Sequence, residues 1–241
     1  MKKINIIIVA LVFLNLIFNT FLLLNSNKET TLNYLFNASY GLIFFTGGII
    51  GLTKKLYFLG SALIFYALGL FAWTYYNLIL GIPAPYPGLP DLFFLFFQPL
   101  LILGYISLIK SYNGKFGLKT SIEVILIFVV FFVILASFLD FSVGILKLPT
   151  TELILGIAYP FFDSLLVALA IAGIRTEGGS VHPNLLIFAF AAFFMASADT
   201  VFAYRIAQDS YWNGGISDSL FLIAGTLFSA GIISIKEKVS Q

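Results

Sequence analysis

Eight long apolar segments follow one another along the chain, and they limit its fold more than any other feature. Each is roughly 20 residues long, the length of helix that crosses the hydrocarbon core of a bilayer. Long runs such as 122–134 lack the two-residue alternation of a membrane β-strand. We therefore predict an all-α polytopic membrane protein with about eight transmembrane helices, at residues 4–24, 32–52, 56–80, 91–109, 122–145, 151–174, 184–206 and 218–235.

The basic residues between these segments indicate how the chain crosses the membrane. Ten of the 13 Lys and Arg residues fall on one side of the predicted bilayer, and Lys28, Lys147 and Arg205 fall on the other. Basic residues in short loops favour the cytoplasmic side, so both termini are predicted to be cytoplasmic in a multi-pass protein of the cell membrane. No small-residue cleavage site follows residues 4–24, so we interpret them as a retained span rather than a signal peptide.

The chain is predicted to form one integral membrane domain, residues 1–241, because no linker or charge run divides it. A weak repeat relates its halves, 1–116 and 117–241. A shift of 127 residues overlays the fourth span on the eighth and pairs Asp91 with Asp218. Four spans per half would give a parallel duplication about an axis along the membrane normal.

Composition excludes several classes of chemistry. The chain has no cysteine and one histidine, which excludes disulfides, thiolate metal sites, iron–sulfur clusters and bis-histidine haem. No nucleophile–base set, phosphate-binding loop or dinucleotide fingerprint occurs, so we expect no enzymatic activity, no metal and no cofactor. A net charge of +2 gives no reason to expect a nucleic-acid partner.

Two aspartates lie deep within predicted spans. Asp163 is roughly 16 Å from the outer end of the sixth span, and Asp199 is roughly 15 Å from that of the seventh, at 1.5 Å per residue. Adjacent antiparallel helices would place the two carboxyl groups at matching depth. They could form a proton-sharing or cation-binding pair. Alternatively, each is neutral and hydrogen-bonded to a hydroxyl or a free carbonyl, such as the one released by Pro160.

The remaining polar candidates lie at the outer ends of the spans. Asp91 and Asp218 open the fourth and eighth spans, where an aspartate caps a helix and could also line an outward-facing vestibule. Arg205 is predicted to form an ion pair with Asp209 or Asp218, and an anion clamp is the alternative.

Aromatic residues also gather at these ends, among them Trp73, Tyr76, Tyr86 and Tyr204, and an interfacial belt accounts for most of them. The proline-rich loop 82–90 around Tyr86 is interpreted as a stiff lid.

Smaller signals concern packing and helix starts. Interhelical hydrogen bonds are predicted for the side chains of Asn15, Asn19 and Gln98. Close approach between helices is predicted at Gly47, Gly48 and Gly51. Helix starts are expected at a capping box of Thr120 and Glu123, at Thr150 or Thr151, and at Pro183, with His182 as a cap.

Several of these residues form a pattern that resembles a known family. The strings Pro85-Tyr-Pro-Gly-Leu-Pro-Asp91, Tyr159-Pro-Phe-Phe-Asp163 and Ala198-Asp199 with Tyr204 are similar to elements of a multi-span prokaryotic membrane sensor region. That region is usually found ahead of PAS, GGDEF and EAL signalling domains. The resemblance implies that Tyr159 joins the aspartates in a ligand site. No output domain follows residue 241, so a sensor would signal through a separate cytoplasmic partner.

Three functions remain open on the sequence alone. The first is a sensor-like or small-ligand-binding membrane module with an outward-facing polar pocket. The second is a small secondary transporter that uses the deep aspartates to bind a small ligand or cation. The third is a structural membrane subunit whose polar residues serve packing within the lipid bilayer.

Overall fold

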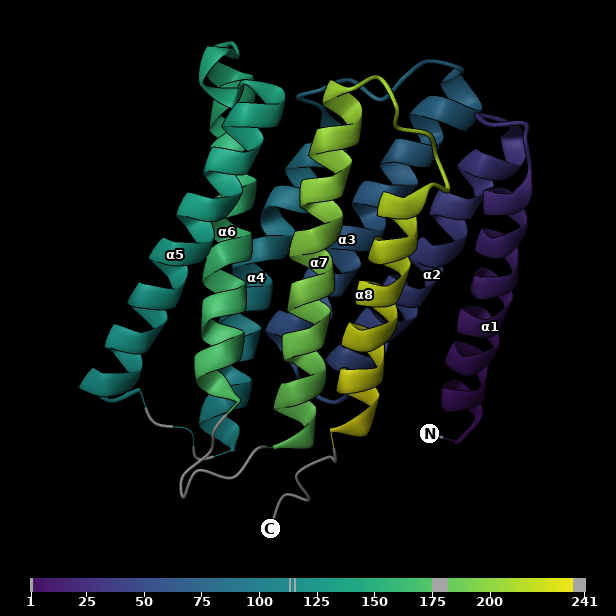
Figure 1. Ribbon diagram of the computed structural model, residues 1–241. Helices are drawn as coiled ribbons and strands as arrows, with labels where there is room; N and C mark the ends of the chain where they lie inside the picture. The colour runs from purple at the N-terminus through teal and green to yellow at the C-terminus, as the bar shows by residue number, and fades with distance from the viewer. Residues whose placement is uncertain (1, 113, 115, 175–181, 236–241) are drawn as a thin grey trace.

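The structure is a computed structural model that describes residues 2–112, 114, 116–174 and 182–235, and this part of the chain is all-helical (Figure 1). Its long helices are α1 (Lys2–Leu24), α2 (Thr31–Thr53), α3 (Tyr57–Thr74), α4 (Leu89–Ser111), α5 (Leu118–Val143), α6 (Thr150–Gly173), α7 (Pro183–Ala207) and α8 (Ile216–Ser234). A π-helical turn, Tyr75–Leu80, continues α3, and a 3-10 turn, Ile145–Lys147, precedes α6. Each predicted span corresponds to one helix, and all eight are long and apolar enough to cross a membrane, which makes this a multi-pass membrane protein.

The helices run up and down through one bundle. Helix α1 begins and α8 ends at the same end of the bundle, and the connections 81–88, 144–149 and 208–215 lie at the opposite end, called the distal end below (Figure 1). The most extensive packing joins α2 to α3, α3 to α4, and α7 to α8. Helix α1 packs on α2 and α8, and α5 packs mainly on α6 at the other side of the bundle.

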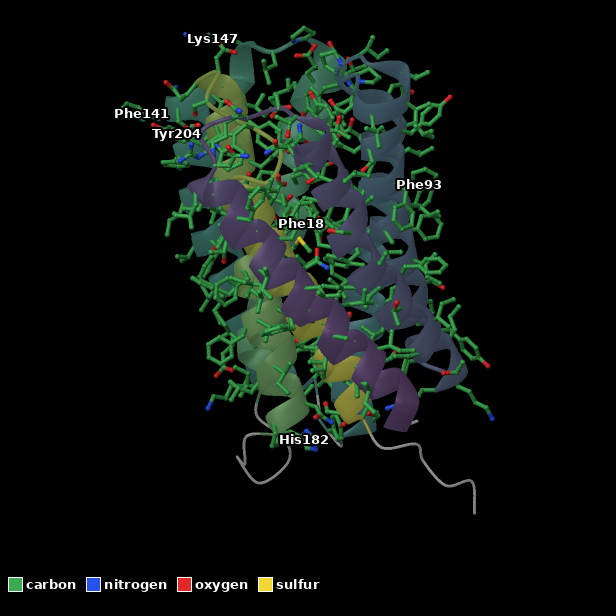
Figure 2. All side chains as sticks on the ribbon, turned by 90° about the vertical axis from the view of Figure 1, so that its right-hand side faces the viewer. Phe18, Phe93, Phe141, Lys147, His182 and Tyr204 are labelled. Carbon is green, nitrogen blue, oxygen red and sulfur yellow. The ribbon has the colours of Figure 1, made fainter. Side chains whose placement is uncertain are left out.

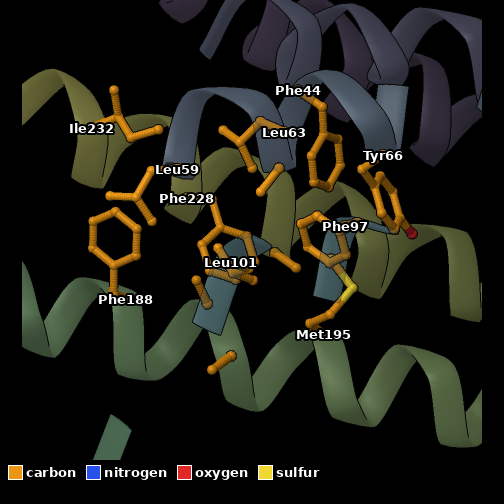
Figure 3. Close-up of a cluster of buried hydrophobic side chains, with 14 of the residues drawn as sticks. Phe44, Leu59, Leu63, Tyr66, Phe97, Leu101, Phe188, Met195, Phe228 and Ile232 are labelled. Atoms are coloured by element: carbon orange, nitrogen blue, oxygen red, sulfur yellow. The ribbon is translucent and has the colours of Figure 1, made fainter. Parts of the chain in front are cut away.

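Aromatic and aliphatic side chains form the core between α2, α3, α4, α7 and α8 (Figure 3). Its largest buried members include Phe44, Leu59, Phe97, Phe188 and Phe228. By contrast, Leu139 is the one residue buried in α5, and Phe141 at its distal end projects from the bundle and is 93% exposed (Figure 2). The outer faces of α1 and α5 are therefore apolar surfaces that suit lipid.

The predicted helix starts are partly confirmed. Pro183 is the first residue of α7, and the imidazole of His182 accepts a hydrogen bond from the backbone N–H of Asn184 at 3.3 Å. The capping box of Thr120 and Glu123 is wrong, because Gly117 already accepts from the backbone N–H of Ser121 and starts α5 earlier.

Threonine is not the cap of α6 either. The carbonyl of Pro149 accepts from the backbone N–H of Leu153, so Thr150 and Thr151 already belong to the first turn of the helix. Proline satisfies the geometry of a helix start without a side-chain acceptor, because its φ is already fixed near the required value.

Close approach of α2 and α3 depends on glycine, as the sequence predicted. A Cβ added to Gly60 would lie 2.7 Å from the backbone nitrogen of Leu52 and 2.8 Å from the carbonyl oxygen of Gly48. A Cβ on Gly51 would lie 2.8 Å from the Cα of Gly60. Backbone atoms cannot turn away as side chains can, so this contact excludes any larger residue at Gly60.

Replacing Gly60 with alanine is therefore expected to lower the free energy of unfolding by about 1–3 kcal/mol. Gly156→Ala is the matched control, because its added Cβ would meet nothing closer than 3.6 Å. Alanine is favoured over glycine inside a helix by about 0.5–1 kcal/mol, so the control should be neutral or stabilised. Unfolding by SDS in mixed micelles measures both, and equal losses would contradict the close-packing argument.

Candidate functional site

A cavity of about 530 Å³ lies within the distal half of the bundle. It extends from Ala84 and Tyr86 in the loop before α4 to Gln98, Asp163 and Asp199 within the helices. Its walls are mainly aromatic and aliphatic, and their aromatic members include Tyr40, Tyr66, Trp73, Phe94, Phe97, Tyr159, Phe202, Tyr211 and Phe221. Tyr66 and Phe97 also belong to the core in Figure 3, so the inner part of the cavity rests on tightly packed helices.

Two carboxyl groups meet within the spans at the inner part of this cavity. Asp163 on α6 is 2% exposed, and its carboxyl group is hydrogen-bonded to that of Asp199 on α7. The Nε2 of Gln98 on α4 donates to Oδ1 of Asp163 at 2.8 Å. Two carboxyl groups can hydrogen-bond only when at least one carries a proton, so this pair carries at most one negative charge. The structure thus brings together two aspartates predicted to lie at matching depth.

A proline opens the hydrogen-bonding pattern of α6 beside the pair. Pro160 has no backbone N–H, so the carbonyl of Gly156 loses the donor that a helix normally supplies. Both residues line the cavity. This segment therefore adds a backbone acceptor one to two turns from Asp163.

Asp91 both opens a helix and lines the cavity. Its carboxylate accepts from the backbone N–H of Gly88 at 2.8 Å and from the hydroxyl of Tyr159 at 3.2 Å. Nearby in the distal loop, burial raises the pKa of Tyr86 to about 12, and the charges of Asp91 and Glu152 add to the shift. The Tyr86 phenol therefore keeps its proton at physiological pH and remains a hydrogen-bond donor among acidic side chains.

Asp218 has a similar place at the start of α8 and is more deeply buried, at 2% exposed. It accepts from the backbone N–H of Gly214 at 2.6 Å, from the hydroxyl of Tyr211 at 3.3 Å and from that of Tyr40 at 3.5 Å. Burial and then the charge of Asp218 hold the pKa of Tyr211 well above its usual range. The capping role predicted for Asp91 and Asp218 therefore fits both, and both also face the cavity.

The connection between α7 and α8 is held by one asparagine that the sequence did not single out. Glu29 accepts from the backbone N–H and the side-chain amide of Asn213, at 2.6 and 2.9 Å. The Oδ1 of Asn213 accepts from the indole of Trp73 at 2.8 Å and from the amide of Asn37 at 2.6 Å. Asn33 donates to the Asn213 carbonyl at 2.8 Å. The spacing of Asn33 and Asn37, one turn apart in an apolar span, was the available signal.

The sequence-predicted candidate residues divide into two groups. Seven line the cavity: Trp73, Tyr86, Asp91, Tyr159, Asp163, Asp199 and Asp218. Tyr76, Tyr204 and Arg205 do not. Tyr76 packs edge-on against Tyr75, with ring centroids 6.1 Å apart, and Tyr204 is 42% exposed with its ring 6.0 Å from that of Phe138.

The ion pair predicted for Arg205 is wrong. Its Nη1 donates to the carbonyl of Ser210 at 3.4 Å, and no carboxylate of the described residues pairs with it. The reason is local, because α7 ends at Ala207 and the chain folds back so that Ser210 meets the guanidinium first. The oxygens of Asp218 are already occupied by three other donors.

Some cavity residues were missed or were given another role from sequence. Gln98 was predicted to form a hydrogen bond between helices, and its side-chain amide does donate to Asp163 on α6. Gln98 also lines the cavity, which the sequence did not predict. Asn37 and Glu152 were not predicted to take part. Glu152 lies at the distal end of its span, as Asp91 does, and this shared position was the only sequence signal that Glu152 could take part in the site.

No protein-family model, curated protein or solved structure matches this chain.

Proposed function

We propose that this chain is a sensor-like membrane module that binds a small ligand in the distal cavity. The observation that carries this proposal is the Asp163–Asp199 pair within a cavity of about 530 Å³. Ionisable groups inside a bilayer are costly and are found mainly where they serve a ligand, an ion or a proton. The volume falls within the range of about 300–1,000 Å³ typical of small-molecule sites, and the apolar walls with few polar groups are typical as well.

The orientation of the cavity is part of the proposal. The excess of basic residues on the side of the termini supports cytoplasmic ends and a cavity that faces the outside of the cell. The weak repeat of 1–116 and 117–241 supports a parallel duplication. Asp91 and Asp218 agree with it, because each accepts a hydrogen bond from a backbone N–H just before its helix.

The resemblance to prokaryotic sensor regions supports a signalling role. In that role, occupancy of the cavity changes the packing of helices that meet at Asp163 and Asp199, and a cytoplasmic signalling partner detects the change. Helices α6 and α7 extend from the carboxyl pair toward the end of the bundle that carries both termini, so they are the elements through which the change would pass.

A secondary transporter is the second candidate, and the opened hydrogen-bonding pattern of α6 at Pro160 favours it. This function predicts proton- or sodium-dependent flux into proteoliposomes that Asp163→Asn abolishes. Unchanged flux in that variant would rule out a coupling role for the pair.

Native mass spectrometry of the purified protein tests the binding function directly. We expect a co-purifying small molecule in the wild type and its loss in Asp199→Asn, because the substitution removes one of the two paired carboxyl groups that face the cavity. Asp209→Asn is the matched control, since Asp209 is exposed and outside the cavity. Unliganded masses for all three proteins, with Asp199→Asn merely less stable, would instead indicate a structural subunit.

A further inference from the structure

We propose that the cavity takes an organic monocation, a molecule with one ammonium-type nitrogen and an apolar or aromatic body. This inference rests on the proposed function and specifies the ligand for the same site. It is carried by the charges around the cavity, by buried acceptor oxygens that have no donor, and by aromatic walls.

The charges around the cavity all have one sign. Its ionisable lining residues at neutral pH are Asp91, Glu152, Asp163, Asp199 and Asp218, and the described residues that line it include no Lys, Arg or His. Asp91 and Asp218 already accept from backbone N–H groups and tyrosine hydroxyls. The carboxyl pair, in contrast, has one donor from Gln98 and no positive partner. The pair carries at most one negative charge, so a single cationic group is enough to neutralise it.

Two buried amide oxygens independently point to a ligand that donates hydrogen bonds. Gln98 and Asn37 are each 1% exposed and line the cavity, and Oε1 of Gln98 and Oδ1 of Asn37 have no hydrogen-bond partner. A buried acceptor without a partner costs about 1–3 kcal/mol, so a donor at these positions would be favourable. The freed carbonyl of Gly156 adds a third acceptor. An anionic ligand would bring further acceptors to a site that already has too many.

The walls fit the rest of such a molecule. Tyr66, Phe97 and Phe221 surround the inner part of the cavity, and Trp73 and Phe202 continue the aromatic wall toward the distal end. Aromatic faces attract cations as well as burying apolar groups. The cavity therefore combines a charged acceptor site with an apolar chamber.

The same geometry disfavours a metal ion as the ligand. Calcium takes six to eight oxygen ligands, and magnesium requires an octahedral set. Within the residues that the structure describes, no three acidic or histidine side chains are close enough together to hold a metal ion. The acidic groups are spread along the cavity, which suits an elongated organic molecule better than a point charge.

Three probes with one shape and different charge test this inference on the purified full-length chain. They are 4-phenylbutylammonium, its neutral isostere 4-phenylbutan-1-ol and the anion 4-phenylbutanoate. We expect the amine to bind at least tenfold more tightly than the alcohol and the anion not to bind, as measured by calorimetry with the detergent buffer as reference. In Asp199→Asn the preference for the amine should fall below threefold, whereas Asp209→Asn should retain it.

The comparison among probes in the wild type requires no variant, so poor folding of Asp199→Asn would not obscure it. Equal binding of alcohol and amine, or tightest binding of the anion, would overturn the cationic ligand while leaving a small-molecule site in place. Absence of binding by all three probes would also overturn it. The proposed function would be overturned as well only if none of the three probes bound and native mass spectrometry also found no co-purifying molecule.

Discussion

Replacing Asn213 with alanine is expected to lower the free energy of unfolding by about 3–5 kcal/mol, because it removes the acceptor of one buried and one half-buried donor within a network that joins several elements. The indole of Trp73 and the amide of Asn37 both donate to its Oδ1. The carboxylate of Glu29 would lose the side-chain amide of residue 213 as a donor and keep its backbone N–H. Removing one side chain thus breaks contacts from α2, α3 and the α1–α2 connection at once.

The measurement is unfolding by SDS in mixed micelles, compared with Asn27→Ala as the control. Asn27 is exposed, and its side chain makes no hydrogen bond in the described structure. Its replacement should change stability by less than about 0.5 kcal/mol. If the two alanine variants lost similar stability, the Asn213 network would not hold the distal end together.

The second prediction compares Asp91 and Asp218, which each occupy the third position of a helix. Asp218→Ala should lower the free energy of unfolding by about 2–4 kcal/mol, and Asp91→Ala should lower it by about half as much. The size of each loss depends on how many buried donors remain unpaired. Asp218 is 2% exposed and accepts from one backbone N–H and two tyrosine hydroxyls. Asp91 is half-buried and accepts from one backbone N–H and one hydroxyl.

Thermal unfolding of both variants in the same detergent measures the difference. Each variant is the other's control, since both substitutions remove a carboxylate from the third position of a helix. Equal midpoints would mean that capping alone accounts for their contribution. A larger loss at Asp91 would contradict the dependence on buried donors.

Much of the fold could be predicted from sequence because the constraint is local. A span in lipid must satisfy its own backbone, so length and apolarity alone indicated all eight helices. Helix starts were predicted less well. A proline at the first turn of α7 is a local signal and was right, whereas Thr120 was wrong because Gly117 could start α5 one turn earlier.

The site was predictable only as far as depth along a helix determines position. Asp163 and Asp199 could be expected at one level, since the rise per residue is fixed. Arg205 shows the limit of such reasoning, because a short sequence distance to Asp209 did not bring their charges together. Asn213 shows the other limit, since its partners come from residues more than a hundred positions away.

The sequence by itself determined that this chain crosses a bilayer in eight helices and carries acidic groups at unusual depth, because both follow from the composition and spacing of each span. The tertiary structure alone decided which faces of those helices meet. It joined the two deep carboxyl groups, enclosed them with Gln98 and Asn37 in one aromatic cavity, and left Tyr76, Tyr204 and Arg205 outside it. Rotation of each helix about its axis depends on packing with neighbours, and no single span contains that information.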